Sequence, residues 1–143
     1  MVTYTVTSSR FATAVHILTL LAYEREEALT SDYIAGSVNT NPVVIRRILK
    51  RLAIVGLVIS VRGASGGSRL GKPPGDITLL DVFSAVEDDK LIEGHAQQPN
   101  PRCPVGSRMV GVLAPRIGAA TAAFFDTLRR TTIADNLREI SQH

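Results

Sequence analysis

Residues 56–70 (Gly-Leu-Val-Ile-Ser-Val-Arg-Gly-Ala-Ser-Gly-Gly-Ser-Arg-Leu) constrain the fold of this chain more than any other segment. Two short apolar or β-branched runs flank a turn rich in glycine and serine, which predicts a small β-hairpin. Arg62 and Arg69 lie one on each side of this turn. Residues 41–52, directly upstream, form a basic amphipathic segment. A basic helix that leads straight into a basic hairpin is the arrangement of a winged helix-turn-helix domain.

The segment 41–52 has sequence signals for both the start and the end of a helix. Asn41 is a good N-cap, and Pro42 suits the first helical position, where its missing N–H costs nothing. Gly56 is expected to end the helix. One face is apolar, with Val44 or Ile45 followed by Ile48, Leu49 and Leu52. The opposite, exposed side carries Arg46, Arg47, Lys50 and Arg51, paired at a spacing of four residues.

Two helices are expected before this one. Thr7 or Ser8 is a candidate cap for the first helix. Its apolar stripe consists of Phe11, Ala14, Val15, Leu18, Leu21 and Ala22. A polar turn at residues 24–27 ends it, and a short helix over residues 30–38 follows. A short helix, a tight turn and a longer basic helix form the helix-turn-helix pattern.

In that pattern the second helix enters the major groove of DNA with its N-terminal residues foremost. Arg47 is suited to pair with guanine, and neighbouring valines are suited to contact thymine methyl groups. Arg62 in the hairpin is suited to a narrow minor groove, where negative potential is concentrated. The candidate DNA-binding residues are Ser8, Asn41, Val43, Val44, Arg46, Arg47, Lys50, Arg51, Arg62 and Arg69, with Arg46, Lys50 and Arg51 assigned to phosphates.

The charge distribution favours a polyanionic partner. The 143 residues carry a formal net charge of +3, but residues 1–75 hold nine Lys/Arg against four Asp/Glu, whereas residues 76–143 hold seven against nine. Neutralising phosphates releases counterions and supplies most non-specific affinity for nucleic acid. The alternative is that these residues are an ordinary solvated helix face.

The C-terminal part predicts further helices. Thr78 and Asp81 resemble a capping box, residues 87–102 are expected to form an exposed loop, and Cys103-Pro104 is expected to open a long helical region. Pro115 is expected to kink or break that helix. Thr132 and Asp135 predict the start of a terminal helix through Leu137 and Ile140.

The long helical region is expected to pack against a second copy of the chain, because it follows a complete small domain and a two-fold dimer matches a palindromic operator. Folding back on its own core is the alternative. The candidate interface residues are Met109, Val112, Leu113, Ile117, Ala120, Phe124 and Leu128. The expected organisation is a winged helix-turn-helix domain over residues 1–87, an exposed loop over 88–102 and dimerisation helices over 103–143. The fold is therefore expected to be mainly α with a small β-hairpin wing.

An ordered series of motifs resembles the Rrf2 family of bacterial transcription regulators. The series is Gly56-Leu57-Val58, Ser60-Val61-Arg62-Gly63, Gly66-Gly67, Leu70, Ile77-Thr78-Leu79-Leu80-Asp81-Val82 and Ala85-Val86-Glu87. The resemblance covers nearly the whole chain. It implies a winged-helix repressor or activator that dimerises through the long C-terminal helix, with base reading near Val43, Val44 and Arg47. Ser68 replaces the aromatic residue that usually follows the paired wing glycines.

Many members of this family hold a [2Fe–2S] cluster on three cysteines in the loop before the dimer helix. This chain has one cysteine, Cys103, which matches the last of those positions. Two subunits would supply only two thiolates, with His95 as a doubtful addition, so no iron–sulfur cluster and no other cofactor is expected. The chain therefore resembles the cluster-free branch of the family. Cys103 is a candidate redox sensor, because a helix start and Arg102 would stabilise its thiolate. It is alternatively a thiol without a signalling role, and the effector could instead be a small molecule.

Enzymatic function is not expected. Residues 66–72 satisfy the spacing of a phosphate-binding loop, but Pro73 stands where the magnesium-binding Ser or Thr belongs. His16 lies in an apolar helix and is expected to be a core histidine, and no metal-ligand spacing is present. Neither a signal peptide nor an apolar run of about 18 residues is recognised, so a cytoplasmic protein without membrane contact is expected. A winged-helix module that binds protein instead of DNA is the alternative function.

Overall fold

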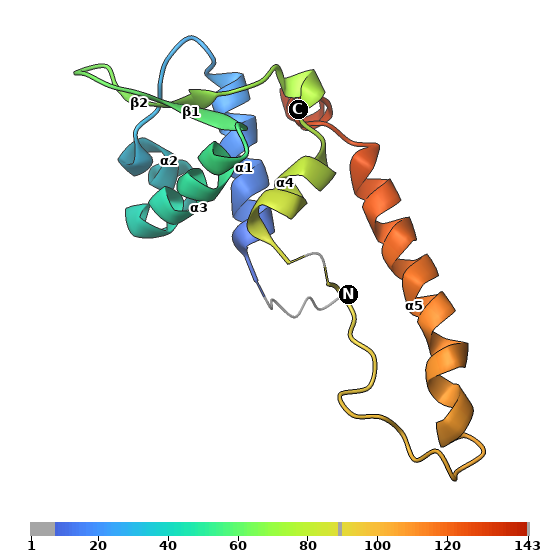
Figure 1. The fold of residues 1–143 in the computed structure, drawn as a ribbon. Coiled ribbons are helices and arrows are strands. Elements are labelled where there is room, and N and C mark those ends of the chain that lie inside the picture. Colours follow the sequence, from blue (N-terminus) through green and yellow to red (C-terminus); the bar gives the residue numbers. More distant parts are fainter. Residues whose placement is uncertain (1–7, 89, 143) are drawn as a thin grey trace.

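The computed structural model describes residues 8–88 and 90–142. It is mainly helical with one two-stranded antiparallel hairpin, as the sequence predicts (Figure 1). The elements in chain order are α1 (Arg10–Tyr23), α2 (Ser31–Val38), α3 (Pro42–Ile54), β1 (Val58–Val61), β2 (Gly67–Leu70), the short 3₁₀ helix η1 (Pro74–Asp76), α4 (Leu79–Val86), α5 (Gly106–Arg129) and α6 (Ile133–Ser141).

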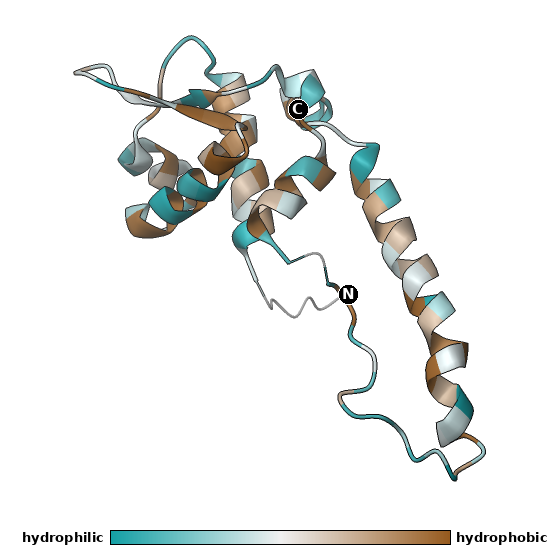
Figure 2. Cartoon of the chain, viewed as in Figure 1, coloured by the Kyte–Doolittle hydropathy of each residue, from teal (hydrophilic) through white to brown (hydrophobic). Residues whose placement is uncertain are grey.

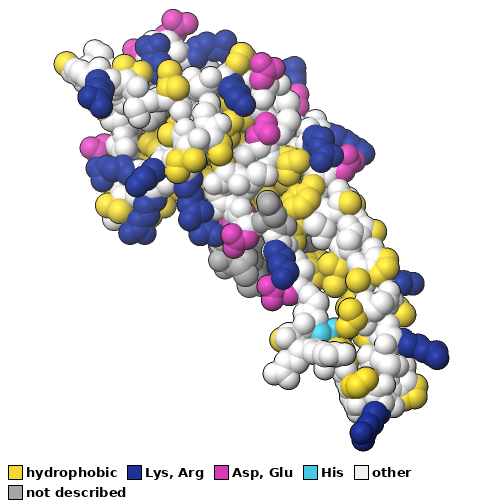
Figure 3. All heavy atoms as spheres, viewed as in Figure 1, with side chains coloured by type: hydrophobic (Ala, Val, Ile, Leu, Met, Phe, Trp, Pro, Cys, Tyr) yellow, Lys and Arg dark blue, Asp and Glu magenta, His cyan; other side chains and the backbone are white. Residues whose placement is uncertain are grey.

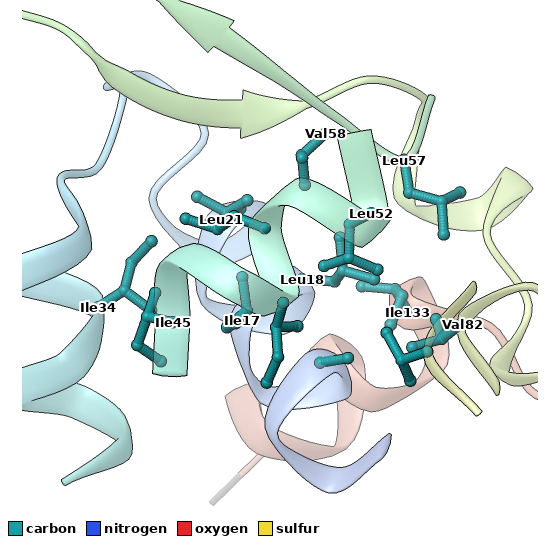
Figure 4. Packing of buried hydrophobic residues seen from close by; sticks show 14 of the residues in the cluster. Ile17, Leu18, Leu21, Ile34, Ile45, Leu52, Leu57, Val58, Val82 and Ile133 are labelled. Atoms are coloured by element: carbon teal, nitrogen blue, oxygen red, sulfur yellow. The ribbon is translucent and has the colours of Figure 1, made fainter. Parts of the chain in front are cut away.

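One hydrophobic core holds the N-terminal domain together around α1. Figure 4 shows side chains from α1, α2, α3, β1, α4 and α6 meeting in this core. Each fully buried aliphatic side chain stabilises the fold by about 1.5–3 kcal/mol. The largest fully buried side chains are Ile17, Leu18, Leu21, Ile34, Ile45, Leu52, Leu57, Ile77, Val82, Val86 and Ile133.

The predicted cap of α1 is wrong. Ser9 occupies the N-cap position, and its side chain makes no capping hydrogen bond. Ser8 accepts a hydrogen bond from the Arg10 N–H at 3.2 Å, and its hydroxyl donates to the Glu87 carboxylate at 2.7 Å. Thr7 lies outside the described residues. The helix therefore starts at Arg10, one residue later than a Ser8 cap would place it, and Ser8 links this start to Glu87 at the end of α4.

The turn between α2 and α3 follows the prediction closely. Thr30 caps α2 by accepting the Tyr33 N–H, and Asn41 caps α3 by accepting the Val43 N–H at 2.8 Å. Between them, Asn39 adopts the left-handed conformation (φ 64°), and its N–H bonds to the Ala35 carbonyl. Asparagine tolerates this conformation better than most residues. The tight turn thereby sets α3 at its angle to α2.

The end of α3 is fixed by a Schellman motif. Gly56 is in the left-handed region (φ 78°), and its N–H donates to the Ala53 carbonyl at 3.0 Å. The Leu57 N–H donates to the Leu52 carbonyl at 2.9 Å, and both leucines are buried. This pair of bonds and the accompanying apolar contact are the features of the motif. The chain therefore leaves α3 directly into β1, as Gly56 predicts.

The hairpin forms the wing, and β2 is held on both sides. Val58 pairs with Leu70, and Val61 pairs with Gly67. On its other edge, Ser68 exchanges two backbone hydrogen bonds with Leu29, at 2.8 and 3.0 Å. Gly67 (φ 150°) lies so close to Leu29 that a Cβ on it would stand 2.3 Å from the Leu29 carbonyl oxygen. The wing base is thus built on close backbone contact, with a buried serine at position 68.

Two capping boxes start α4 and α6 next to each other. The Thr78–Asp81 box begins α4, and the Thr132–Asp135 box begins α6, both as predicted. The backbone N–H of Ile133 donates to the Ile77 carbonyl at 2.9 Å, and the Ile133 side chain is fully buried in the core. Helix α6 therefore packs on the first domain, against α1, although the expected organisation groups it with the dimerisation helices.

Helix α5 differs from its prediction at two points. It begins at Gly106 with Val105 as N-cap, so Cys103 lies upstream of the cap and does not open the helix. It also continues through Pro115 as one helix, so of the expected kink or break the break is wrong. A proline removes the hydrogen bond to the carbonyl four residues earlier and crowds it. The carbonyl concerned is that of Gly111, and α5 nevertheless continues from Gly106 to Arg129.

Helix α5 extends away from the domain and has no buried residue along its 24 positions (Figures 1 and 2). It is long and apolar enough to cross a membrane, with a mean hydropathy of 1.2 over 18 residues. The expectation that no segment reaches this length is therefore wrong. Helix α5 reaches this hydropathy without a continuous apolar run, because charged residues such as Arg116 are interspersed with its alanines, glycines and aliphatic residues.

Four aromatic rings attach the C-terminal half of α5 to the domain. Phe83 of α4 lies 5.4 Å from Phe124 and 5.9 Å from Phe125, measured between ring centroids. Phe11 of α1 lies 5.6 Å from Phe83 on its other side. Such aromatic pairs contribute about 0.5–1.5 kcal/mol each beyond their burial. Phe124, which is 41% exposed, therefore makes intramolecular contacts as well as presenting surface.

Candidate nucleic-acid interface

The exposed side of α3 and the tip of the wing form a basic surface, which we define as Arg46, Arg47, Lys50 and Arg62. All four side chains are exposed. Within residues 8–88 and 90–142 none of them forms an ion pair or a side-chain hydrogen bond. Figure 3 shows Lys and Arg side chains gathered over this side of the domain. The surface therefore presents uncompensated positive charge.

Several cations elsewhere are neutralised within the chain. Arg10 pairs with Glu87 at 3.1 Å, and Lys90 pairs with Glu93 at 3.5 Å. Arg129 and Arg130 both pair with Asp126. Burial acts to raise the pKa of Glu87, but hydrogen bonds from Arg10 and Ser8 and the charge of Arg10 hold it below its usual value. In the part of the chain that the structure describes, the four cations of the basic surface have no acidic partner of this kind.

The N-terminal turn of α3 presents the residues expected to face base edges. Val43 is 46% exposed and Val44 is half-buried against the core. Arg47 follows one turn later on the exposed side. The side-chain oxygen of Asn41 accepts the capping bond from the Val43 N–H, so its amide nitrogen is left to contact a base as a donor.

Arg51 and Arg69 are exposed but hydrogen-bonded within the molecule. Arg51 donates to the Val86 carbonyl at 3.0 Å, and this carbonyl belongs to the last turn of α4. Arg69 donates to the Glu26 carbonyl at 3.1 Å, which ties β2 to the turn after α1. Cationic side chains satisfy carbonyls at helix ends in this way. Both arginines therefore have positions that brace the fold beside the basic surface.

A groove of about 480 Å³ separates α3 from the hairpin. Arg46 and Lys50 line one wall, and Ser60 of β1 and Ser31 at the start of α2 also line it. Sequence reasoning missed both serines as candidate site residues. The hairpin prediction places Ser60 on a strand, but only the packing of the wing on α3 shows which face it occupies.

Cys103 lies beside the start of α5 and is partly exposed. Hydrogen bonds from the backbone N–H groups of Gly106 and Val105 lower the pKa of its thiol. The expected stabilisation by a helix start is thus present, although Cys103 is not the N-cap, whereas Arg102 is not among the groups that lower this pKa. Among the described residues no group of three or more His, Cys, Asp or Glu side chains is placed to hold a metal. One thiol per chain does not fit the four-ligand set of an iron–sulfur cluster.

His16 is not a core residue, contrary to the prediction. Its side chain is exposed on α1, and Nε2 lies 2.9 Å from the Ser37 hydroxyl oxygen on α2. The apolar stripe of α1 turns the neighbouring Ile17 into the core instead. Residues 66–72, which match the spacing of a phosphate-binding loop, lie largely in β2, and only the short η1 follows them. The segment therefore lacks the long helix whose N-terminus would bind a phosphate.

Comparison with known proteins identifies the family. The model of the Rrf2 family, described as iron-dependent transcriptional regulators, matches residues 7–139. The chain belongs to the Rrf2 family. YwnA of Bacillus subtilis (strain 168), named as a proposed HTH-type transcriptional regulator, is 36% identical over 133 residues, which cover 93% of this chain and 98% of YwnA.

Solved structures show the same fold. A crystal structure of a proposed DNA-binding protein is 35% identical, with a TM-score of 0.72, and the match covers 90% of this chain and 99% of that one. IscR of T. potens has a TM-score of 0.73 at 22% identity, over 94% of this chain and 87% of that one. This Rrf2 protein is accordingly a winged-helix transcription regulator and not an enzyme.

Proposed function

We propose that this Rrf2 protein binds double-stranded DNA as a homodimer and reads a palindromic operator. The observation that carries the proposal is the basic surface, whose four cations have no acidic partner in the described chain. Unpaired Lys and Arg on one face supply affinity for phosphate through counterion release. Their position on the second helix of a helix-turn-helix and on a wing matches the geometry of groove binding.

Each cation of the basic surface has a distinct proposed role. Arg47 and the exposed Val43 lie in the first half of α3, where they would contact base edges, with Val44 and the Asn41 amide beside them. Arg46 and Lys50 line the groove toward the wing and would contact phosphates. Arg62 at the wing tip would enter the minor groove.

Ser8, Arg51 and Arg69 have weaker claims to DNA contact. The Glu87 carboxylate, 2.7 Å from the Ser8 hydroxyl, would repel a phosphate there. Arg51 and Arg69 hold α4 and β2 in place. We assign both arginines to positioning α3 and the wing.

The dimer would form through α5. This helix has no buried residue in the single chain, and an apolar helix face without cover indicates a partner surface. Val112 is 51% exposed, and Met109, Leu113 and Ile117 are half-exposed on the part of α5 beyond the aromatic contacts. A two-fold axis through paired α5 helices would place two copies of α3 on successive half-sites of a palindrome.

Pairing through α5 also accounts for its hydropathy without a membrane. Arg108 and Arg116 are exposed along the helix, which suits a helix–helix interface that keeps a solvated side. We therefore propose a cytoplasmic location. We also propose that the protein acts without an iron–sulfur cluster, because Cys103 is its sole cysteine. Whether oxidation of this thiol alters DNA affinity is tested by comparing reduced and oxidised protein.

Selection of bound sequences from a random DNA pool tests the proposal. The expected result is a palindromic consensus for the wild type. Arg47→Ala should cost about 1–3 kcal/mol in operator binding and relax the preference at one base pair in each half-site. Lys90→Ala is the control, because it removes a cation that lies outside the basic surface. Recovery of no consensus and no affinity at low salt would favour the alternative, a winged-helix module that binds protein.

A further inference from the structure

A cavity of about 540 Å³, open to solvent, lies between α1, α2 and α6, apart from the basic surface. Its wall surface is mainly apolar, with Val15 and Leu20 on α1 and Leu137 and Ile140 on α6. Sites for small molecules are typically apolar cavities of about 300–1,000 Å³ with a few polar groups. The volume and the lining therefore match a molecule of one or two rings.

Hydrogen-bonding groups gather at one end of this cavity. His16 of α1 and Ser37 of α2 lie 2.9 Å apart there, and both belong to the lining. The hydroxyl of Thr19 already donates to the Val15 carbonyl at 2.7 Å and is not free to donate into the cavity. A ligand that touches both α1 and α2 would therefore hydrogen-bond at the His16–Ser37 pair, while Asn136 and Glu139 offer further polar groups on α6.

The charges of the lining exclude one class of ligand. Among the described residues that form the walls there is no Lys or Arg, while Glu139 of α6 contributes a carboxylate. A carboxylate with no compensating cation repels an anion that would otherwise enter an apolar site. We propose that this cavity binds a small, mainly apolar effector that carries no negative charge and hydrogen-bonds at the His16–Ser37 pair.

The position of the cavity links the effector to α3. Ser37 lies in the last turn of α2, two residues before Asn39, whose left-handed conformation forms the turn into α3. A ligand that hydrogen-bonds to His16 or Ser37 would replace the hydrogen bond between them. The contact between α1 and α2 would then change. Helix α2 in turn sets the position of α3. This regulatory step rests on the proposed DNA binding, whereas occupation of the cavity does not.

Binding is measured without DNA through an introduced tryptophan, because the chain has none. Tyr23 lines the cavity and is 65% exposed, so Tyr23→Trp places the reporter at its rim. The probes are 4-phenylbutanol, 4-phenylbutylamine and 4-phenylbutyrate, which share one apolar body and differ in charge. We expect saturable emission changes with the alcohol and the amine. The Kd of the carboxylate should be at least about tenfold higher than that of the alcohol. Tyr33→Trp, on α2 and outside the lining, should report no change.

Two further substitutions in the Tyr23→Trp protein test the site itself. Ala12→Phe fills the cavity from α1 and should raise the Kd of the alcohol about tenfold or more. Glu139→Gln, a conservative change on the exposed side of α6, should weaken the amine and leave the alcohol unchanged. Absence of saturable binding, equal binding of the carboxylate, or an equal response from Tyr33→Trp would overturn the proposal.

Operator affinity with and without 4-phenylbutanol tests the regulatory step separately. A change in Kd for the operator that Ala12→Phe abolishes supports it, and saturable binding with unchanged operator affinity overturns it. A protein that binds the probes but no DNA would overturn the proposed function and leave the cavity site standing.

Discussion

Replacing Gly67 by alanine tests whether the wing is held as the structure describes. Gly67 has φ 150°, and an added Cβ would stand 2.3 Å from the oxygen and 2.5 Å from the carbon of the Leu29 carbonyl. These neighbours are backbone atoms, which cannot rotate away as a side chain can. The substitution therefore forces β2 away from Leu29.

The cost follows from what this separation breaks. The two backbone hydrogen bonds between Leu29 and Ser68 would be lost, at about 0.5–1.5 kcal/mol each. Alanine in this backbone conformation adds about 1–3 kcal/mol of strain. The sum is about 2–6 kcal/mol, a large part of the 5–15 kcal/mol typical of a folded domain.

Urea unfolding followed by circular dichroism measures this loss, with Gly75→Ala as the matched control. Gly75 lies in η1, has nothing within 4 Å of its open side and does not have a positive φ. The control should lie within about 0.5 kcal/mol of the wild type. If Gly67→Ala also lies within that range, the close contact between β2 and Leu29 is refuted.

Four further outcomes are expected. Thr132→Ala removes the cap of α6 and should lower the free energy of unfolding by about 1 kcal/mol, and an unchanged urea midpoint would contradict the capping box. Because the pKa of Glu87 is lowered in the folded protein, its contribution to stability is present above the ordinary pKa of a glutamate and is lost as the pH falls through the lowered value. The wild type should therefore lose more stability on acidification than Glu87→Gln, measured as urea midpoints across that range. The Cys103 thiol should react with iodoacetamide at a lower pH than free cysteine does, and an equal pH profile would count against the backbone hydrogen bonds to its sulfur. Val112→Asp should shift the protein from dimer to monomer in light scattering at unchanged helicity, whereas a persistent dimer would place the interface elsewhere.

The helix-turn-helix and the wing could be predicted because their determinants are local. Asn41 and Pro42 start α3, Gly56 ends it, and the turn glycines define the hairpin, so each signal lies within a few residues of its effect. The two capping boxes were predictable for the same reason. Charge on one face of α3 followed from helical periodicity alone.

Contacts between distant segments could not be predicted in this way. The bonds of Arg51 to Val86 and of Arg69 to Glu26 depend on the placement of α4 and of the α1–α2 turn, which periodicity does not give. The exposure of His16 depends on the position of α2, because its partner Ser37 is 21 residues away. Pro115 predicts a kink or break from the general effect of its missing N–H, and no local signal in the sequence shows that α5 continues through it.

The dependence of operator affinity on salt concentration tests the central claim, that the basic surface binds DNA phosphates. In the proposed dimer, Arg46 and Lys50 would make two phosphate contacts per protomer and four in all, so log Kd should rise with log salt with a slope of about 3.5 or more. Lys50→Ala should reduce that slope by roughly 2, while Lys90→Ala leaves it unchanged. A shallow slope in the wild type, or equal slopes for wild type and Lys50→Ala, would contradict the account.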